Sequence, residues 1–216
     1  KVKETKKKFK VEKEIKKLIK DLKKFSRPSL LIGGGIKSAN ATKDLLKLGN
    51  ILKIPMFPTW NALDTVSSDY KYYAGRIGTY GGAGRNFGIQ NSNLVICLGS
   101  RISGRITGGN VPSFAREAKK YCIDIDKPSL NKKHQQVKID VNIHSDAKIF
   151  IKKLIKQLKK ENFKSDNIKA DWLRKCLNWK TKYDPVLKKY YNTKSFVHPY
   201  VFIRKFSQKL KKKDIL

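Results

Sequence analysis

Cysteine, histidine and long apolar runs are scarce in this sequence of 216 residues. The three cysteines, Cys97, Cys122 and Cys176, form no CxxC pair, so neither a disulfide framework nor a zinc site is predicted. Cys97 and Cys122 lie inside apolar runs, and we interpret them as small residues of the core. The three histidines have no acidic or cysteine partner at the spacing of metal ligands.

A membrane-spanning segment and a secretory signal are not found in the sequence either. No apolar run approaches the roughly 20 residues that cross a bilayer. Residues 1–18 are charged throughout and contain no apolar signal-peptide core. The sequence therefore predicts a cytoplasmic localisation and no membrane partner.

Acidic residues are few. The sequence has 17 Asp and Glu and 50 Lys and Arg, which gives a formal net charge of +33. Such a charge is compatible with nucleic-acid binding, since cations release counterions from phosphate. The cations are mostly lysines, however, whereas arginine dominates specific phosphate and base recognition. Their helical spacing, as in KEIKKLIKDLKK, is typical of a solvated helix face. We expect no nucleic-acid partner and keep nucleic-acid binding as an alternative.

Short apolar runs alternate along the chain with segments of helical periodicity. We predict strands at 29–32, 54–57, 94–98, 121–125 and 137–143, and helices at 1–24, 39–52, 114–120, 147–160, 170–187 and from 199 onward. The stretch 75–88 is rich in glycine and is predicted to be irregular. Nearly continuous apolar strands between helices predict an α/β fold with a parallel sheet and helices on both faces. Such sheets bind ligands at the carboxyl ends of their strands.

The alternation divides the chain into three parts. Residues 27–160 carry the regular pattern, residues 1–26 precede it as a helix or linker, and residues 161–216 follow as a linker with two further helices. The last three residues, 214–216, look like the opening of a strand, so we expect the final part to be the helical entry to a truncated second α/β domain.

Three consecutive glycines, Gly33, Gly34 and Gly35, follow the first predicted strand and precede a helix. Glycine at such a turn lets backbone N–H groups and a helix N-terminus approach a phosphate closely. The spacing is not GxGxxG, so a tight strand-to-helix turn and a phosphate contact both stay open.

Two arginines, Arg101 and Arg105, follow the third predicted strand in the segment GSRISGRITGG. Their guanidinium groups lie among glycines and hydroxyls, and arginine suits bidentate binding of carboxylate or phosphate. The alternative is a surface loop whose arginines pair with acidic residues.

Acidic residues follow the later strands. Asp124 and Asp126 lie around the end of the fourth, where a carboxylate can accept hydrogen bonds from ribose hydroxyls or an adenine edge. Capping of the following turn is the alternative for Asp126, and helix capping is equally open for Asp146. No nucleophile lies at a suggestive spacing from a base, so no catalytic residue is predicted in this chain.

Five blocks of the sequence carry a resemblance to a known family: RPSLLIGGGI, IPMFPTWNALD, GRIGTYGGAGRNFGIQNSNLVICLGSRISGRITG, FAREAKKYCIDIDKPSLNK and HSDA. Their order and spacing resemble the Rossmann-like central domain of thiamine-diphosphate-dependent enzymes of the acetolactate synthase large-subunit type. The resemblance covers about residues 27–158, and NFGIQNSNLVICLGSRI is its most specific part. It implies a central FAD- or nucleotide-binding domain at 27–160, preceded by the end of a pyrimidine-binding domain and followed by the start of a diphosphate-binding domain.

The resemblance also implies cofactors and partners. Thiamine diphosphate and Mg²⁺ would be bound by parts outside this chain, so the fragment alone is expected to be inactive. The central domain of the acetolactate synthase branch binds FAD, which takes no redox part in the main reaction. A homodimer or homotetramer is expected for the full protein, with a 2-keto acid substrate and a carbonyl acceptor.

Carried over by position, the resemblance assigns a role to each candidate site residue. The diphosphate or ribityl part of FAD would lie against Gly33, Gly34 and Gly35. The flavin side would lie against Thr59 and Trp60, and the phosphates or adenine side would lie against Arg101. The adenosine end would lie against Asp124, Ile125, Asp146 and Ala147. Arg105 would read the carboxylate of the second substrate, for which a guanidinium is physically apt.

The sequence departs from the family pattern at three positions near the flavin or the substrate. Ser103, which we also expect near the cofactor, and Gly104 stand where acetolactate synthases usually carry acidic residues, and Tyr80 stands where histidine is common. The resemblance thus predicts a thiamine-diphosphate carboligase that decarboxylates pyruvate or a similar 2-keto acid. A decarboxylase or hydrolase on the same scaffold, a carboligase acting on a keto-sugar nucleotide and a non-catalytic nucleotide-binding module are the alternatives.

Overall fold

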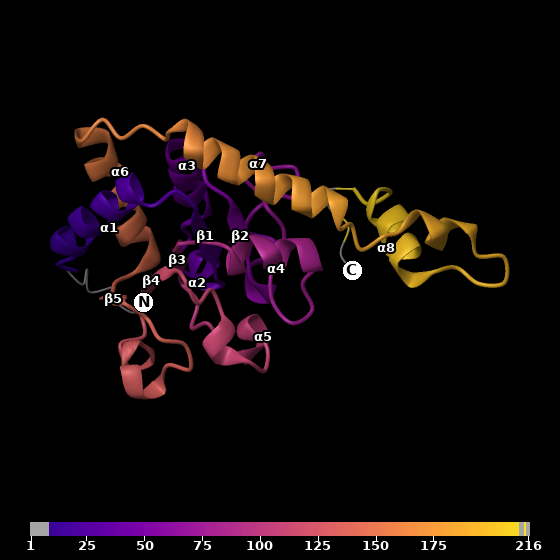
Figure 1. Ribbon diagram of the computed structural model, residues 1–216, viewed down its shortest axis with the longest axis horizontal. Helices are drawn as coiled ribbons and strands as arrows, with labels where there is room; N and C mark the ends of the chain where they lie inside the picture. Colours follow the sequence, from indigo (N-terminus) through magenta and orange to yellow (C-terminus); the bar gives the residue numbers. More distant parts are fainter. Residues whose placement is uncertain (1–8, 212–213, 215–216) are drawn as a thin grey trace.

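A five-stranded, wholly parallel sheet forms the centre of the computed structural model, which describes residues 9–211 and 214 (Figure 1). The strands lie in the order β2 (Met56–Pro58), β1 (Pro28–Ile32), β3 (Leu94–Leu98), β4 (Lys119–Asp124) and β5 (Val141–His144). Every residue of β1, β2 and β3 is buried, which explains why these strands appear as uninterrupted apolar runs. The predicted fold class is confirmed.

One face of the sheet is covered by helices from both ends of the regular pattern. These are α1 (Glu12–Lys24), α2 (Gly35–Ser38), α3 (Thr42–Leu52) and α6 (Ala147–Lys160). In α1 the apolar residues recur at helical spacing, and Ile15, Leu18 and Leu22 are buried in the same core as β1 and β3. Asp21 accepts a hydrogen bond from the hydroxyl of Tyr121 in β4. The sequence places α1 before the regular pattern, yet it packs as part of this unit.

The other face is covered by α4 (Ala83–Gln90) and α7 (Asn167–Lys182), which lie side by side (Figure 1). The indole N–H of Trp172 in α7 donates to the carbonyl of Pro28 at 3.1 Å. A methyl group on Gly84 would lie 2.2 Å from the carbonyl oxygen of Trp179, and one on Gly88 would lie 2.4 Å from the ring of Phe57. Glycine is therefore needed in α4 for the close approach of α7 and β2.

Side-chain caps explain where the two long C-terminal helices begin. Asp146 accepts the backbone N–H of Ile149 at 2.9 Å, and Asp166 accepts that of Lys169 at 2.9 Å. The helix prediction for 147–160 is confirmed to the residue, and the capping alternative for Asp146 is the arrangement observed. The helix predicted at 170–187 begins and ends earlier.

Two predictions of local structure were wrong, and one short helix was missed. The glycine-rich stretch predicted to be irregular contains most of α4, because tight packing against α7 outweighs the low helix propensity of glycine. The helix predicted at 114–120 is not formed; Ala115 has a positive φ of 42°, its N–H donates to the side chain of Gln90 at 2.6 Å, and β4 begins at Lys119. A short helix not predicted, α5 (Gly104–Thr107), follows β3.

The C-terminal part lies beyond the end of α7 and away from the sheet (Figure 1, yellow). It contains α8 (Pro199–Ser207), which has no buried residue. Short 3₁₀ turns complete the described structure at Trp60–Ala62, Val111–Ser113, Pro128–Leu130, Lys132–His134 and Lys188–Asn192. The strand expected at 214–216 falls mainly on residues outside the described part. In the residues that the structure describes, no helix is long and apolar enough to cross a membrane.

Candidate functional site

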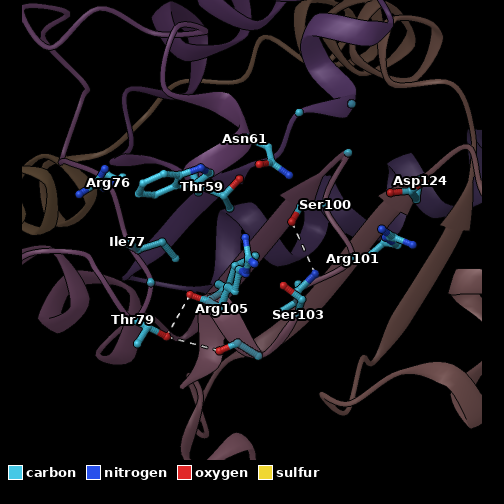
Figure 2. Close-up of a pocket in the computed structure, with 18 of the residues that line it drawn as sticks. Thr59, Asn61, Arg76, Ile77, Thr79, Ser100, Arg101, Ser103, Arg105 and Asp124 are labelled. Atoms are coloured by element: carbon cyan, nitrogen blue, oxygen red, sulfur yellow. Dashed lines mark hydrogen bonds between the residues drawn. The ribbon is translucent and has the colours of Figure 1, made fainter. Parts of the chain in front are cut away.

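A cavity of about 1010 Å³ opens at the carboxyl ends of the strands (Figure 2). In the strand order β2-β1-β3-β4-β5, the chain reverses its winding direction between the neighbours β1 and β3, and open parallel sheets bind ligands at such a point. The walls come from the segments that follow β1, β2, β3 and β4. The cavity thus lies where the sequence predicts a ligand site, at the carboxyl ends of the parallel strands.

The glycines after β1 pack against the turn after β3. A methyl group on Gly33 would lie 2.0 Å from the carbonyl oxygen of Gly99, and one on Gly35 would lie 2.8 Å from its Cα. Gly99 itself has a φ of +63°, a backbone conformation that favours glycine. The tight-turn interpretation therefore holds for Gly33 and Gly35.

Gly34 and Gly35 line the cavity, whereas Gly33 does not. The N–H of Gly35 donates to the carbonyl of Gly99 at 3.0 Å. For the N–H of Gly34, no acceptor is found among the described residues. An unpaired backbone donor beside a cavity is a group that an anionic ligand can satisfy.

The loop after β3 brings both predicted arginines to the cavity wall (Figure 2). Arg101 and Arg105 are exposed, and neither forms an ion pair within the described part of the chain. Ile102 between them is buried and has a φ of 45°, which turns the backbone so that its neighbours face outward. Pairing with surface acids, the alternative for these arginines, is not observed in the described part of the chain.

An aromatic and cationic group forms the end of the cavity near β2. Thr59 is buried, and its N–H donates to the carbonyl of Ile32 at 2.8 Å. The neighbouring indole of Trp60 is 54% exposed and lies 5.1 Å below the guanidinium of Arg76. Arg76 also donates to the carbonyl of Tyr80 at 2.9 Å. Exposed rings and a cation at a cavity rim suit the stacking of a planar ligand.

Arg76 was not predicted as a site residue, and Tyr80 was named only as a departure from the family pattern near the flavin or the substrate. They belong to the glycine-rich segment 75–82, and its hydroxyl-bearing Thr79 donates to the carbonyl of Arg105 at 3.2 Å. This contact joins the segment to the arginine loop although the two lie far apart in the sequence. An arginine and two hydroxyls among glycines were the available signal.

The half-buried side chain of Arg85 packs against the same glycine-rich segment. Its side chain fills the space beside Gly75 and Gly82, where added methyl groups would lie 2.2 Å and 2.0 Å from its atoms. Burial lowers the pKa of this guanidinium from its ordinary value.

Carboxylates occupy the opposite end of the cavity, beside Arg101 (Figure 2). Asp124 ends β4 and accepts the backbone N–H of Asp126 at 2.9 Å, while the carbonyl of Asp126 accepts the hydroxyl of Ser129. Side-chain capping by Asp126, the alternative interpretation, is not found among the described residues. Asp124 retains free acceptor capacity facing the cavity, as a ribose contact requires.

The remaining predicted site residues divide into two groups. Ser103 lines the cavity, as do Thr59 and Trp60. Three others lie outside its lining, namely Ile125, Asp146 and Ala147. The carboxylate of Asp146 is engaged by the helix that it caps, and Ala147 is buried in the first turn of α6.

The balance of charge in the cavity favours an anion. Arg76, Arg101 and Arg105 line it, together with Lys37, whose ammonium pairs with Asp64. Within the described residues, no group of three or more His, Cys, Asp or Glu side chains could hold a metal ion. The arrangement can therefore bind an elongated anionic ligand with a ring at one end and hydroxyls at the other.

Comparisons with known proteins agree with this architecture. A model of the family described as thiamine pyrophosphate enzyme, central domain, matches residues 15–154. The chain is 36% identical to the probable acetolactate synthase large subunit of Methanococcus aeolicus over 181 residues, which are 81% of this chain and 29% of that protein. For the Methanocaldococcus jannaschii protein of the same description, the identity is 31%, over 81% of this chain and 28% of the relative.

A bacterial relative shows the same partial coverage. The large subunit of acetolactate synthase isozyme 2 from Escherichia coli is 36% identical over 114 residues, which are 53% of this chain and 21% of that protein. The chain thus spans less than a third of the length of each of these relatives.

Proposed function

This chain belongs to the thiamine pyrophosphate enzymes, and we propose that it forms the nucleotide-binding central part of a carboligase of the acetolactate synthase type. The complete enzyme would decarboxylate pyruvate or a similar 2-keto acid and transfer the two-carbon unit to a second carbonyl compound. The observation that carries the proposal is the cavity at the β1/β3 edge, with arginines along its wall and Asp124 at one end.

The residues of the cavity are compatible with FAD. The N–H of Gly34, which has no acceptor among the described residues, and the guanidinium of Arg101 would hold the diphosphate. Asp124 would accept ribose hydroxyls. Trp60 at the opposite end would pack against the flavin ring. A volume near 1010 Å³ is at the upper end of ordinary ligand pockets, as a dinucleotide would need.

Arg105 has a different proposed role. Its exposed guanidinium lies on the cavity wall without an ionic partner in the described structure, so it can bind the carboxylate of the second substrate. Thiamine diphosphate, when bound, supplies the electron sink for decarboxylation and carbon–carbon bond formation. We propose that this cofactor and Mg²⁺ are held by polypeptide beyond residues 1–216, because the matched part of this chain is less than a third of the length of each relative.

A decarboxylase or hydrolase on the same scaffold is the second candidate. Ile102, Ser103 and Gly104 separate the two arginines, so no carboxylate stands between them to repel or orient an acceptor. The complete enzyme is further proposed to be cytoplasmic and to act as a homodimer or homotetramer. Relatives named as acetolactate synthase large subunits favour the carboligase.

Binding of FAD and its dependence on Arg101 test the cofactor proposal. The change Arg101→Ala removes charge-assisted hydrogen bonds to the diphosphate and should weaken FAD binding by about 10- to 100-fold. Arg116→Ala is the matched control, since the side chain of Arg116 is 76% exposed and lies outside the cavity. Flavin fluorescence quenching measures both affinities, and equal affinities for the two variants would contradict the proposal.

Product analysis tests the reaction. The complete protein, supplied with thiamine diphosphate, Mg²⁺ and pyruvate, is expected to release carbon dioxide and form acetolactate. Acetaldehyde or acetate as the main product would favour the decarboxylase or hydrolase instead. Arg105→Ala should reduce the yield of acetolactate more than the release of carbon dioxide, because it removes only the acceptor contact.

A further inference from the structure

Two buried thiols lie directly beneath the loop that carries the cavity arginines. Cys97 in β3 and Cys122 in β4 are opposite each other in the register of these parallel strands. Their side chains are 0% and 3% exposed. The sequence indicates only that they are small residues of the core; the structure confirms their burial and adds a polar contact.

The contact joins both thiols to one backbone carbonyl. The Sγ atom of Cys97 lies 3.1 Å from the carbonyl oxygen of Ser100, and the Sγ atom of Cys122 lies 3.6 Å from the same oxygen. No other donor reaches this oxygen from the residues that the structure describes. A partly buried carbonyl without a partner is unfavourable, so these two weak donors determine which way the Ser100 peptide faces.

This peptide immediately precedes Arg101. The backbone reverses at Gly99, with a φ of +63°, and again at Ile102, with a φ of 45°. At the turns themselves, the N–H of Gly99 donates to the carbonyl of Ile123 and the side chain of Ile102 is buried in the core. Between them, among the residues that the structure describes, the Ser100 carbonyl on the thiols is the one hydrogen bond from the backbone to the sheet below. Rotation of the Ser100 peptide would therefore redirect Arg101 and shift the start of α5, which carries Arg105.

Both thiols can act as donors only while they are protonated. Burial, and then the neighbouring Cys122 thiol, raise the pKa of Cys97 well above its ordinary value. Cys97 therefore keeps its proton across the physiological range and is a poor nucleophile. A role as a hydrogen-bond donor fits this environment, whereas a role in thiolate chemistry does not.

We propose that Cys97 and Cys122 are positioning residues for the cavity, which hold the Ser100 carbonyl toward the sheet and so direct Arg101 at the ligand. The inference rests on the proposed ligand site but concerns how this chain builds it. The thiols touch no ligand; they act through the peptide that precedes the arginine.

Paired double variants separate positioning from packing. Cys97→Val with Cys122→Val keeps an apolar core and removes both donors, whereas Cys97→Ser with Cys122→Ser keeps both donors and puts hydroxyls into an apolar core. The valine pair should bind FAD about tenfold more weakly than the unchanged protein. The serine pair should bind within about twofold of it, although serine should lower the urea midpoint more than valine does. Affinity and stability thus change in opposite order between the two pairs.

A second measurement needs no ligand. Hydrogen–deuterium exchange of residues 100–107 should accelerate by about tenfold in the valine pair, while β4 stays protected as in the unchanged protein. If the unchanged protein binds no FAD, the cofactor proposal fails and the exchange rates alone decide the positioning role. Unchanged exchange in the valine pair overturns the inference, as does an FAD affinity that simply follows stability in both pairs.

Discussion

Glycine at three positions allows two backbone segments to meet where the cavity begins. The turn after β1 and the turn after β3 lie so close that Gly33 and Gly35 face Gly99 with no room for a side chain. Hydrogen bonds across the contact, including one from the N–H of Gly33 to the carbonyl of Leu98 at 2.9 Å, hold the two turns together. These glycines serve the architecture of the site. Of the three after β1, only Gly34 both lines the cavity and has an N–H without an acceptor in the described part of the chain.

We predict that Gly33→Ala destabilises the protein by about 2–4 kcal/mol, because its new methyl group would lie 2.0 Å from the carbonyl oxygen of Gly99. Urea unfolding followed by tryptophan fluorescence measures the loss. Gly109→Ala is the control: nothing lies within 4 Å of its added methyl group, so a change within about 0.5 kcal/mol is expected. Equal effects at the two positions would contradict the close-approach explanation.

At the scale of single elements, the end of α3 is held by a tyrosine from the following loop. The hydroxyl of Tyr70 donates to the carbonyl of Leu46 at 2.9 Å and lies 3.2 Å from Oδ1 of Asn50. Burial, and then the neighbouring Tyr72, raises the pKa of Tyr70 to about 12, because the ionised form would lose its hydration. The neutral hydroxyl therefore stabilises this junction.

The raised pKa predicts a loss of stability at alkaline pH. Unfolded tyrosine ionises near pH 10 and Tyr70 in the folded state near 12, so its contribution is complete below pH 10 and is lost as the pH rises toward 12. Tyr70→Phe should cost about 1 kcal/mol at pH 8, and its difference from the unchanged protein should shrink above pH 10. Tyr200→Phe, whose ring is 53% exposed, should show no such convergence. Urea midpoints from pH 8 to 11.5 measure both; a constant difference for Tyr70→Phe would exclude this account.

At the scale of the whole molecule, the formal net charge of +33 places many cations on the surface of the folded chain. Ion pairs connect α1 to α6. Lys153 of α6 pairs with Glu12 of α1 at 2.7 Å, and Glu161, which follows α6, pairs with Lys23 of α1 at 2.8 Å. With 17 acidic residues against 50 basic ones, most cations have no such partner, and their mutual repulsion opposes the compact state.

We therefore predict that the melting temperature of this chain rises by several degrees between about 0.02 M and about 0.3 M NaCl, because salt shortens the screening length. Differential scanning calorimetry measures the shift. Sodium acetate at the same ionic strength should give the same rise, since screening does not depend on the anion. A melting temperature that falls with salt, or that rises with only one of the two anions, would argue against general repulsion.

The sequence by itself determined the class of fold and most of its elements, because hydrophobic periodicity is local information. The apolar runs at β1 and β3 were located within a residue, and α6 was located exactly by its periodicity and by the cap residue Asp146. The resemblance of five blocks also identified the family. In the cavity, Gly34, Arg101 and Asp124 were expected because they follow strands, and strands of a parallel sheet end at one edge.

Only the tertiary structure decided the strand order and what it brings together. The neighbouring positions of β1 and β3 depend on crossovers and long-range packing, which leave no local pattern in the sequence. The helix at 83–90 forms because α7 packs on its glycines from about 90 residues away. Arg76 reaches the cavity rim through tertiary contacts, with Trp60 and Tyr80 beside its guanidinium and Thr79 of its segment bonded to Arg105. In the same way, Cys97 and Cys122 share one carbonyl only once β3 and β4 lie side by side in register.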